Sequence, residues 1–388
     1  MNSALADIPS GWRWVPVRHL SQNLDYLRVP KNSAERAEMI GNVPYWGANS
    51  VQGYVDRALV EGPIVLVGED GAPFFDPLAS VAFAIDEPIW PNNHVHVLRP
   101  LSGVDFRFLA ASLNAVDYSL YVKGSTRDKL NQSELSAIVL AVPSLEEQEE
   151  IAAFLDRETA EIDAFIADQE ELIGLLAERR RSTQVAVMSR AEVAPRVRLR
   201  FLFSQSREDD SVESEVLSVY RDHGVIPKSS RADNFNKTPE DVSRYLVVRP
   251  GYLVVNKMKA WQGSLGVSDY DGIVSPDYDV LRPTSRTLSP DFAHAYLRSP
   301  RMIGEYAVRS VGIRPAQWRL YWDQLRDIEI PVPSLDRQRE IVRMLNDETA
   351  ELDAAVADAR EAIALSRERR AALISAAVTG EIDVRGAV

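Results

Sequence analysis

Two stretches of the chain share a periodic pattern of apolar and charged residues. In residues 143–190 and 333–383, apolar side chains recur at intervals of seven, and the positions between them are densely charged. This spacing places the apolar residues on one face of a helix, as in the seam of a coiled coil. Helices of this length would each span about 65 Å at 1.5 Å per residue. The positions with this spacing are Leu155, Ile162 and Leu176; Ile166 and Ile173; Phe165 and Leu172; and, in the second stretch, Leu345, Leu352, Val356 and Ile363.

The two stretches are copies of one another. Residues 143–189 align with residues 333–379 at a constant offset of 190, without gaps, and 22 of the 47 positions are identical. The simplest way to bury both apolar stripes is for the helices to pair, and an antiparallel pairing would relate the two halves of the chain by a pseudo-twofold axis. The alternative is that each helix packs against a separate globular core.

The segments before the two helices have similar lengths and a different pattern. Residues 1–142 and 191–332 contain short β-type runs punctuated by glycine and proline, which predicts an α+β fold in each. The run Val97-Leu98-Arg99-Pro100 is echoed by Val280-Leu281-Arg282-Pro283, and Asp105-Phe106 by Asp291-Phe292. The sequence therefore predicts two α+β domains, 1–142 and 191–332, separated by two long helices, 143–190 and 333–383, that form an antiparallel coiled coil. Residues 384–388 would be a short tail.

The net charge of −13 lies mainly on the helices. Residues 143–190 carry −7 and residues 333–383 carry −4, so the α+β segments are close to neutral and could present basic faces to DNA. The chain has no cysteine, no basic and apolar leader at its start, and no run of about 18 apolar residues. We expect a cytoplasmic protein that does not enter a membrane.

The opening of each helix carries a motif that resembles a known family. Pro143-Ser144-Leu145 leads through Gln148 to Ile151, and Pro333-Ser334-Leu335 leads through Gln338 to Ile341. With the duplicated architecture, this resembles the specificity (S) subunit of type I restriction–modification enzymes, the HsdS family. The resemblance covers essentially the whole chain. Residues 44–49 with 53–56, and residues 255–264 with 271–276, each resemble a subclass of the family's target recognition domains; the ending 376–380 also looks like that of the family.

This resemblance implies a function without catalysis in the chain itself. Each α+β domain would be a target recognition domain that reads one half of a bipartite site in double-stranded DNA. The helices would set the spacing between the halves and dock two methyltransferase (M) subunits, and restriction (R) subunits would complete the complex. S-adenosylmethionine, ATP and Mg²⁺ would be bound by those partner subunits, and this chain would need no cofactor.

The candidate DNA-binding residues share a chemistry that suits DNA. Arg, Lys, Asn and Gln read base edges, and Lys, Arg, Ser and Thr hold phosphates. The chain has only seven lysines, yet two lie within three residues of each other, which singles out the second group below. In the first domain the candidates are Trp46, Asn49, Gln52, Lys123, Ser125, Thr126, Arg127 and Lys129, with Asn92, Asn93 and His94 as a structural turn instead. In the second domain they are Lys257, Lys259, Trp261, Gln262, Arg314 and Gln317, with Trp318 expected in the core.

The chain offers little to catalysis. It has no phosphate-binding glycine loop, no Asn-Pro-Pro-aromatic methyltransferase motif and no Gly-x-Ser-x-Gly. His94 and His96 could hold a metal from one strand, but no third ligand is evident, so no metal site is expected. The alternative function is that of a protein-interaction scaffold with a coiled-coil core, which the acidic total favours.

Overall fold

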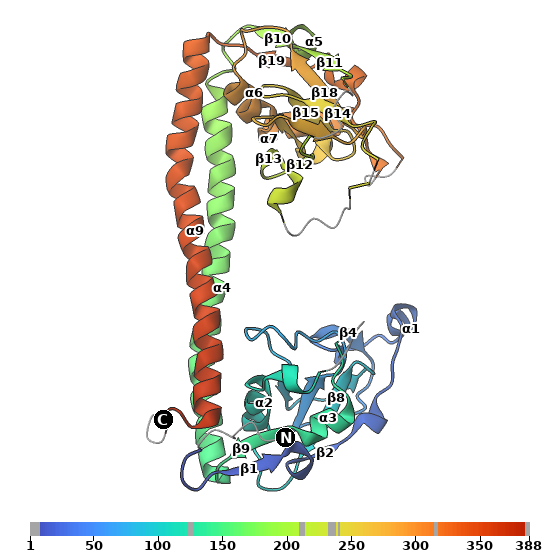
Figure 1. Ribbon diagram of the computed structural model, residues 1–388, viewed down its shortest axis with the longest axis vertical. Coiled ribbons are helices and arrows are strands. Elements are labelled where there is room, and N and C mark those ends of the chain that lie inside the picture. Colours follow the sequence, from blue (N-terminus) through green and yellow to red (C-terminus); the bar gives the residue numbers. More distant parts are fainter. Residues whose placement is uncertain are drawn as a thin grey trace. The chain divides into compact units, whose positions relative to one another are not determined.

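The computed structural model of the protein describes residues 8–122, 128–208, 214–231, 238, 239, 241–313 and 317–384 (Figure 1). The chain divides into two compact units, Met1–Glu171 with Ala359–Val388, and Leu172–Asp358. Each unit therefore contains one α+β domain together with a part of both long helices.

The two long helices are α4, Leu145–Ser189, and α9, Leu335–Thr379, each of 45 residues. In unit 1 the Arg370 Nε donates to the Asp163 Oδ1 at 2.9 Å, and in unit 2 the Arg180 Nε donates to the Asp353 Oδ1 at 2.8 Å. Within unit 1, Arg367 also donates to Glu170, and within unit 2, Arg190 also donates to the sulfur of Met344. In each unit the residue numbers rise along α4 as their partners' numbers fall along α9, so the helices run antiparallel in both units. The repeat offset of 190 converts one ion pair into the other. The predicted antiparallel pair is confirmed.

The seam between the helices follows the heptad spacing, with one exception. Ile162 in α4 and Leu352 in α9, equivalent positions of the repeat, are both buried. Phe165 and Leu172, which share the same interval of seven, are instead 43% and 39% exposed, so their assignment to the buried stripe was wrong. Phe165 precedes the half-buried Ile166 by one residue, and one residue is about 100° around a helix, so an interval of seven alone does not identify the face.

The α+β domain of unit 1 is built on a four-stranded antiparallel sheet. One of its two inner strands, β5 (Ile64–Gly68), is buried at all five positions, because side chains on both of its faces meet a core. Val65 and Val67 pack with helix α2, and Ile64 and Leu66 form a second cluster on the other face. The sheet order is β2 (Ser21–Asn23), β8 (Val95–Pro100), β5 (Ile64–Gly68) and β6 (Ala82–Ile85).

The remaining elements of unit 1 surround this sheet. A two-stranded ladder of β1 (Arg13–Pro16) and β9 (Val139–Val142) leads directly into α4. A smaller sheet pairs β3 antiparallel with β4 and parallel with β7. The other elements are β3 (Val43–Trp46), β4 (Val51–Val55), β7 (Trp90–Pro91), α1 (Ser33–Glu38), α2 (Phe106–Asn114), α3 (Gln132–Ala137) and the 3-10 turns η1 (Val17–His19), η2 (Asp25–Leu27) and η3 (Tyr118–Leu120).

The α+β domain of unit 2 repeats the same sheet. Its order is β11 (Phe203–Ser206), β18 (Tyr278–Pro283), β15 (Leu253–Asn256) and β16 (Leu265–Val267), again antiparallel throughout. Its entry ladder pairs β10 (Arg196–Arg198) with β19 (Glu329–Pro331). The other elements are β12 (Leu217–Tyr220), β13 (Gly224–Pro227), β14 (Leu246–Val248), β17 (Gly272–Val274), α5 (Leu199–Leu202), α6 (Pro290–Leu297), α7 (Pro300–Arg309), α8 (Trp322–Leu325), η4 (Lys228–Ser230) and η5 (Ala260–Gln262).

The two echoes seen in the sequence have different outcomes. The Val-Leu-Arg-Pro runs end the equivalent strands β8 and β18. The second echo was displaced by two residues. Asp105 is the N-cap residue of α2, and the N-cap residue of α6 is Ser289 rather than Asp291. Asp and Ser side chains both cap helices well, so the function of the position is retained although its residue type is not.

A buried glutamine joins each long helix to its domain. The Oε1 of Gln148 accepts from the N–H of Asp105 at 3.0 Å, and its Nε2 donates to the carbonyls of Gly103 and Pro143. In unit 2, Gln338 makes the same three contacts, with the N–H of Ser289 at 2.8 Å and with the carbonyls of Thr287 and Pro333. Both side chains are at most 1% exposed. Because the glutamine makes the same contacts in both units, its presence in the opening motif of both copies of the repeat is explained.

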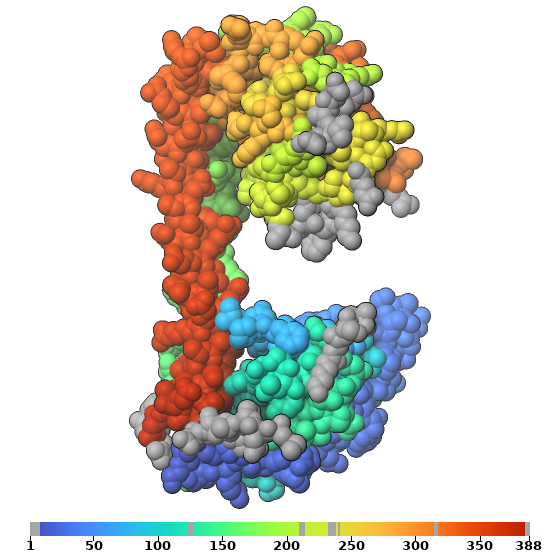
Figure 2. All heavy atoms as spheres, in the orientation of Figure 1, coloured from blue at the N-terminus to red at the C-terminus, as the bar shows by residue number. Residues whose placement is uncertain are grey.

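The outer face of the coiled coil remains polar. Figure 2 shows the side chains of α9 at the surface along the length of the helix. Many of them are charged and fully exposed, such as Asp336. This distribution agrees with the negative charge that the sequence places on these segments.

Replacement of Gln148 by Leu should destabilise unit 1, because one backbone N–H and two carbonyls would lose their partners. We expect the free energy of unfolding to fall by about 2–4 kcal/mol in urea titrations followed by circular dichroism. The matched control is Gln132→Leu, an exposed glutamine in α3, which should change it by less than about 0.5 kcal/mol. If the two substitutions lowered the free energy of unfolding equally, the proposed role of Gln148 in joining the helix to its domain would be wrong.

Candidate nucleic-acid interface

Equivalent loops meet at one end of the central strand in both domains. After β5, the carbonyl of Glu69 accepts from the N–H of Leu130 at 2.8 Å. After β15, the carbonyl of Lys257 accepts from the N–H of Leu320 at 2.9 Å. We call the two segments so joined the loop pair: residues 69–72 with 128–130 in the first domain, and residues 257–263 with 317–320 in the second.

The loop pair of the second domain unites two clusters that are separate in the sequence. The rings of Trp261 and Trp318 meet edge to face with their centroids 5.3 Å apart. The Trp261 Nε1 also donates to the carbonyl of Met258 at 3.1 Å, which closes the turn around Lys259. Both tryptophans are therefore half-buried packing groups, and Trp318 agrees with its expected place in the core only in part. Their contact brings Gln317 beside the lysine-rich loop.

Three side chains of this loop pair remain available to a ligand. Lys259, Gln262 and Gln317 are exposed, and they make no hydrogen bond or ion pair with any other described residue. Lys257 is more constrained, because its Nζ donates to the carbonyl of Pro276 at 2.7 Å. Arg314, the remaining candidate in this domain, lies outside the described residues.

A half-buried carboxyl group, that of Asp279, lies near Lys257. Burial raises the pKa of Asp279 on β18, and the positive charge of Lys257 opposes that rise. Lys257 therefore stabilises the negative charge of Asp279 within the domain. Lys259, whose side chain has no partner among the described residues, is the more available of the two lysines for a ligand.

The loop pair of the first domain has the opposite local charge. Glu69 stands where the second domain has Lys257, and its carboxylate contacts both Arg28 and the Nζ of Lys129, the latter at 3.0 Å. The charge of Lys129 is thus already paired. Asp70 contacts the imidazole of His94. The other candidates of this loop, Lys123, Ser125, Thr126 and Arg127, lie outside the described residues.

A polar hollow of about 540 Å³ lies next to this loop pair. It brings Gln52 of β4 together with Asn93 and adds two cations that sequence reasoning missed, Lys31 and Arg36. The guanidinium of Arg36 lies 4.7 Å from the ring centroid of Tyr45. The hollow is lined by Pro30, Lys31, Asn32, Arg36, Tyr45, Gly47, Ala48, Gln52, Asp70, Asn92, Asn93 and His94.

The other candidates near the hollow have mixed roles. Trp46 packs on Phe83 with ring centroids 5.3 Å apart, so much of its ring belongs to the core. The Asn49 Nδ2 donates to the carbonyl of Gly71 at 3.1 Å, and the Gln52 Nε2 donates to the Ser50 hydroxyl at 3.0 Å. Both amides lie on the surface and keep unused donor and acceptor positions.

The histidines of this region are structural. Asn92 is buried and its Oδ1 accepts from the N–H of His94 at 2.7 Å, which fixes the turn expected here. His96 is buried between the carboxylate of Asp25 at 2.6 Å and the carbonyl of Leu130 at 2.8 Å. Burial tends to raise the pKa of Asp25, but the hydrogen bond and charge of His96 outweigh it and lower that pKa overall. Among the described residues, no three His, Asp or Glu side chains are grouped so that they could hold a metal ion.

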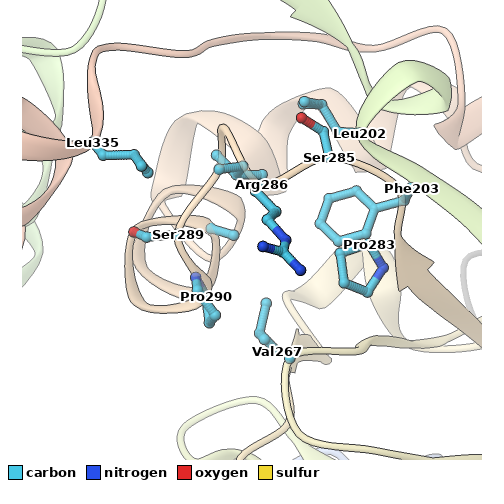
Figure 3. A pocket seen from close by; sticks show the side chains of 12 residues that line it. Leu202, Phe203, Val267, Pro283, Ser285, Arg286, Ser289, Pro290 and Leu335 are labelled. Atoms are coloured by element: carbon cyan, nitrogen blue, oxygen red, sulfur yellow. The ribbon is translucent and has the colours of Figure 1, made fainter.

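A second cavity lies at the other end of the central hairpin of unit 2. It has a volume of about 330 Å³ and is bounded by the first turns of α6 and α9. Figure 3 shows Arg286 reaching into it between Pro283, Pro290 and Val267, while its other walls are mainly apolar. Gly251 and Val267 belong to the opposite end of the β15–β16 hairpin from Lys257, so this cavity is separate from the loop pair.

No helix in the described part of the chain combines the length and the apolar character that crossing a membrane requires.

The first domain is similar in sequence to known proteins. Residues 24–172 match the family model of the type I restriction modification DNA specificity domain. A putative type I restriction enzyme specificity subunit of Haemophilus influenzae, S.HindORF215P, is 35% identical over 147 residues, 38% of this chain and 37% of that protein. The EcoprrI specificity subunit of Escherichia coli is 29% identical over 126 residues, 32% of this chain and 30% of that protein. The matches thus span less than half of either relative.

The fold extends the likeness to the whole chain. A solved chain from work on complex assembly and conformational transition of the type I R-M system aligns with 97% of this chain and 100% of its own length. The TM-score is 0.60 at 16% sequence identity, which shows a shared fold. The first part of the chain is thus similar in sequence to type I restriction enzyme specificity subunits, and the whole chain shares the fold of that solved chain.

Proposed function

We propose that this chain is the DNA sequence-specificity subunit of a type I restriction–modification complex. Each α+β domain, as a target recognition domain, reads one half of a split site in double-stranded DNA. The paired helices set the separation of the halves and dock two methyltransferase subunits, to which restriction subunits are added. The chain is non-catalytic and works in the cytoplasm, and S-adenosylmethionine, ATP and Mg²⁺ belong to its partners.

One observation carries this proposal: the same loop pair occurs in both domains with different side chains. Lys257 replaces Glu69 at a position whose backbone contact is unchanged, and Lys259, Gln262 and Gln317 are left exposed beside it. Lysine and glutamine suit phosphates and base edges. A protein that reads two different DNA segments needs two domains of the same fold with different side chains in their DNA-contacting loops.

The alternative is a protein-interaction scaffold, and the net charge of −13 favours it. The two functions differ in their dependence on salt. A protein that neutralises phosphates releases counterions from DNA, so its affinity falls steeply as salt rises. Binding of a scaffold to protein partners would not depend on DNA at all. Titration of the full chain, with and without its methyltransferase partner, at several salt concentrations distinguishes the two.

Replacement of Lys259 by Gln tests the loop pair of the second domain. We expect DNA affinity to fall about fivefold at 0.1 M salt, and the slope of log K against log salt to become shallower by about 0.9, because one phosphate contact is lost. Fluorescence anisotropy with a labelled duplex measures both. The control Arg326→Gln removes a guanidinium already paired with Asp323 and should leave the slope unchanged. A Lys259 variant that matches wild type would exclude this contact.

Exchange of residues 191–332 for the corresponding domain of a relative should change one half of the recognised site only. Separate domains reading separate segments require this outcome, since the first domain keeps all its contacts. Sequencing of methylated positions in the host genome reads both halves directly. A change in both halves would refute the modular division.

The repeat also predicts the composition of the complex. Because α4 and α9 present equivalent sequences, one copy of this chain should bind two methyltransferase subunits. Native mass spectrometry of the purified complex gives the stoichiometry, and a single bound methyltransferase at saturation would contradict the prediction.

A further inference from the structure

His294 of α6 and Arg298, the residue that follows this helix, form a half-buried pair in unit 2. The Arg298 Nη1 donates to the Nε2 of His294 at 2.6 Å, and the Arg298 Nη2 donates to the carbonyl of Arg221 at 2.6 Å. The Nδ1 of His294 donates to the carbonyl of Val267 at 3.1 Å. An arginine cannot accept a hydrogen bond, so the histidine is neutral with its proton on Nδ1. Burial and the charge of Arg298 lower the pKa of His294, in agreement.

Two glycines make the space for this pair. A Cβ on Gly224, which has a φ of +74°, would lie 2.7 Å from the Cε1 of His294 and 3.2 Å from the Nη1 of Arg298. A Cβ on Gly266 would lie 3.3 Å from the same Cε1. Strands β13 and β16 therefore form a cradle that only small residues permit. The guanidinium is held in one orientation before any ligand arrives.

Arg298 has no anionic partner among the residues that the structure describes. No carboxylate of the described residues lies within ion-pair distance of its guanidinium, and its Nε is buried without an acceptor. Burial lowers the pKa of Arg298, and Asp222, the acidic group that opposes this shift, makes its own ion pair with Arg221 at 3.7 Å. A cation that is partly removed from water and has no counter-charge costs stability. Such a group is best explained by an anion that arrives from outside the chain.

The pair lies beside the loop pair of the second domain. The Cγ of Arg221, whose carbonyl holds Arg298, is 3.9 Å from the position of a Cβ on Gly263. Gly263 directly follows Gln262, and η5 packs on α7, the helix that follows Arg298. Arg221 itself is more than half exposed. An anion bound here would therefore lie next to the exposed Lys259 and Gln262.

We propose that Arg298, oriented by His294, is a pre-positioned receptor for a phosphate group of the DNA backbone. This inference rests on the proposed function and assigns a contact within it. The phosphate would supply the negative counter-charge that Arg298 lacks. Contact between the two would fix the position of the duplex relative to the base-reading side chains. His294 and the two glycines are positioning residues, since they act through the arginine.

The test is the substitution Arg298→Met in the full chain. The melting temperature is measured alongside, because the variant also loses the hydrogen bonds to the Nε2 of His294 and to the carbonyl of Arg221. DNA affinity should fall about tenfold at 0.1 M salt, and the slope of log K against log salt should become shallower by about 0.9. Arg298→Lys, which keeps the charge but not the planar fork, should restore the slope and only part of the affinity.

Ethylation interference locates the contact. Ethylation of one backbone phosphate should weaken binding by the wild-type chain and have no further effect on the Arg298→Met chain. Arg200→Gln is the matched control, because it removes an exposed arginine of the same unit that is already paired with Asp327. It should match wild type in affinity and slope.

Distinct results separate the possible failures. If wild type binds DNA and the Arg298→Met chain has the same affinity and slope, this inference is wrong and the proposed function stands. If the wild-type chain and its complex show no salt-dependent DNA binding, the proposed function itself is wrong. If inorganic phosphate alone stabilises wild type but not the Arg298→Met chain, while DNA affinity is equal, the site serves a free anion and not DNA.

Discussion

A helix of 45 residues with an apolar stripe along one face is not stable alone in water, and this constraint governs the architecture. Nucleation is costly and most helix stability comes from packing of the apolar face, so each long helix needs a partner along its length. Here each copy of the repeat supplies the partner of the other. Ile162 and Leu352 are buried at equivalent positions, and the ion pairs Asp163–Arg370 and Asp353–Arg180 share the same register. Because these pairs are exposed, they report the register more than they stabilise it.

The buried glutamines attach each long helix to its domain in the same way. Gln148 and Gln338 bind only backbone atoms of the domain, so the contact does not depend on the side chains around it. The N-cap residue can therefore be Asp105 in one domain and Ser289 in the other. A connection made through backbone atoms lets the domains diverge while their attachment to the helices is preserved.

The sequence predicted what depends on local periodicity and repetition. The helices, their antiparallel pairing and the duplicated α+β domains follow from intervals of seven and from the offset of 190. The exposed position of Phe165 did not follow from the sequence, because an interval of seven occurs on more than one face of the helix. The site was predicted only in part. Lys259, Gln262 and Gln317 could be chosen by residue type, but the contact of Trp261 with Trp318 joins segments over fifty residues apart. Arg36 and Arg298 gave no local signal, since tertiary packing alone brings them to their positions.

The exchange of Glu69 for Lys257 at one shared backbone position has a consequence for the DNA itself. Glu69 is paired with Arg28 and Lys129, whereas the segment that begins at Lys257 exposes Lys259 and Gln262. Under the proposed function the two loop pairs therefore favour different chemical edges. A palindrome offers the same edges at both ends and cannot satisfy both. The site would then have a direction: the protein would lie on the duplex in one orientation only, and the two DNA strands would not be interchangeable to it.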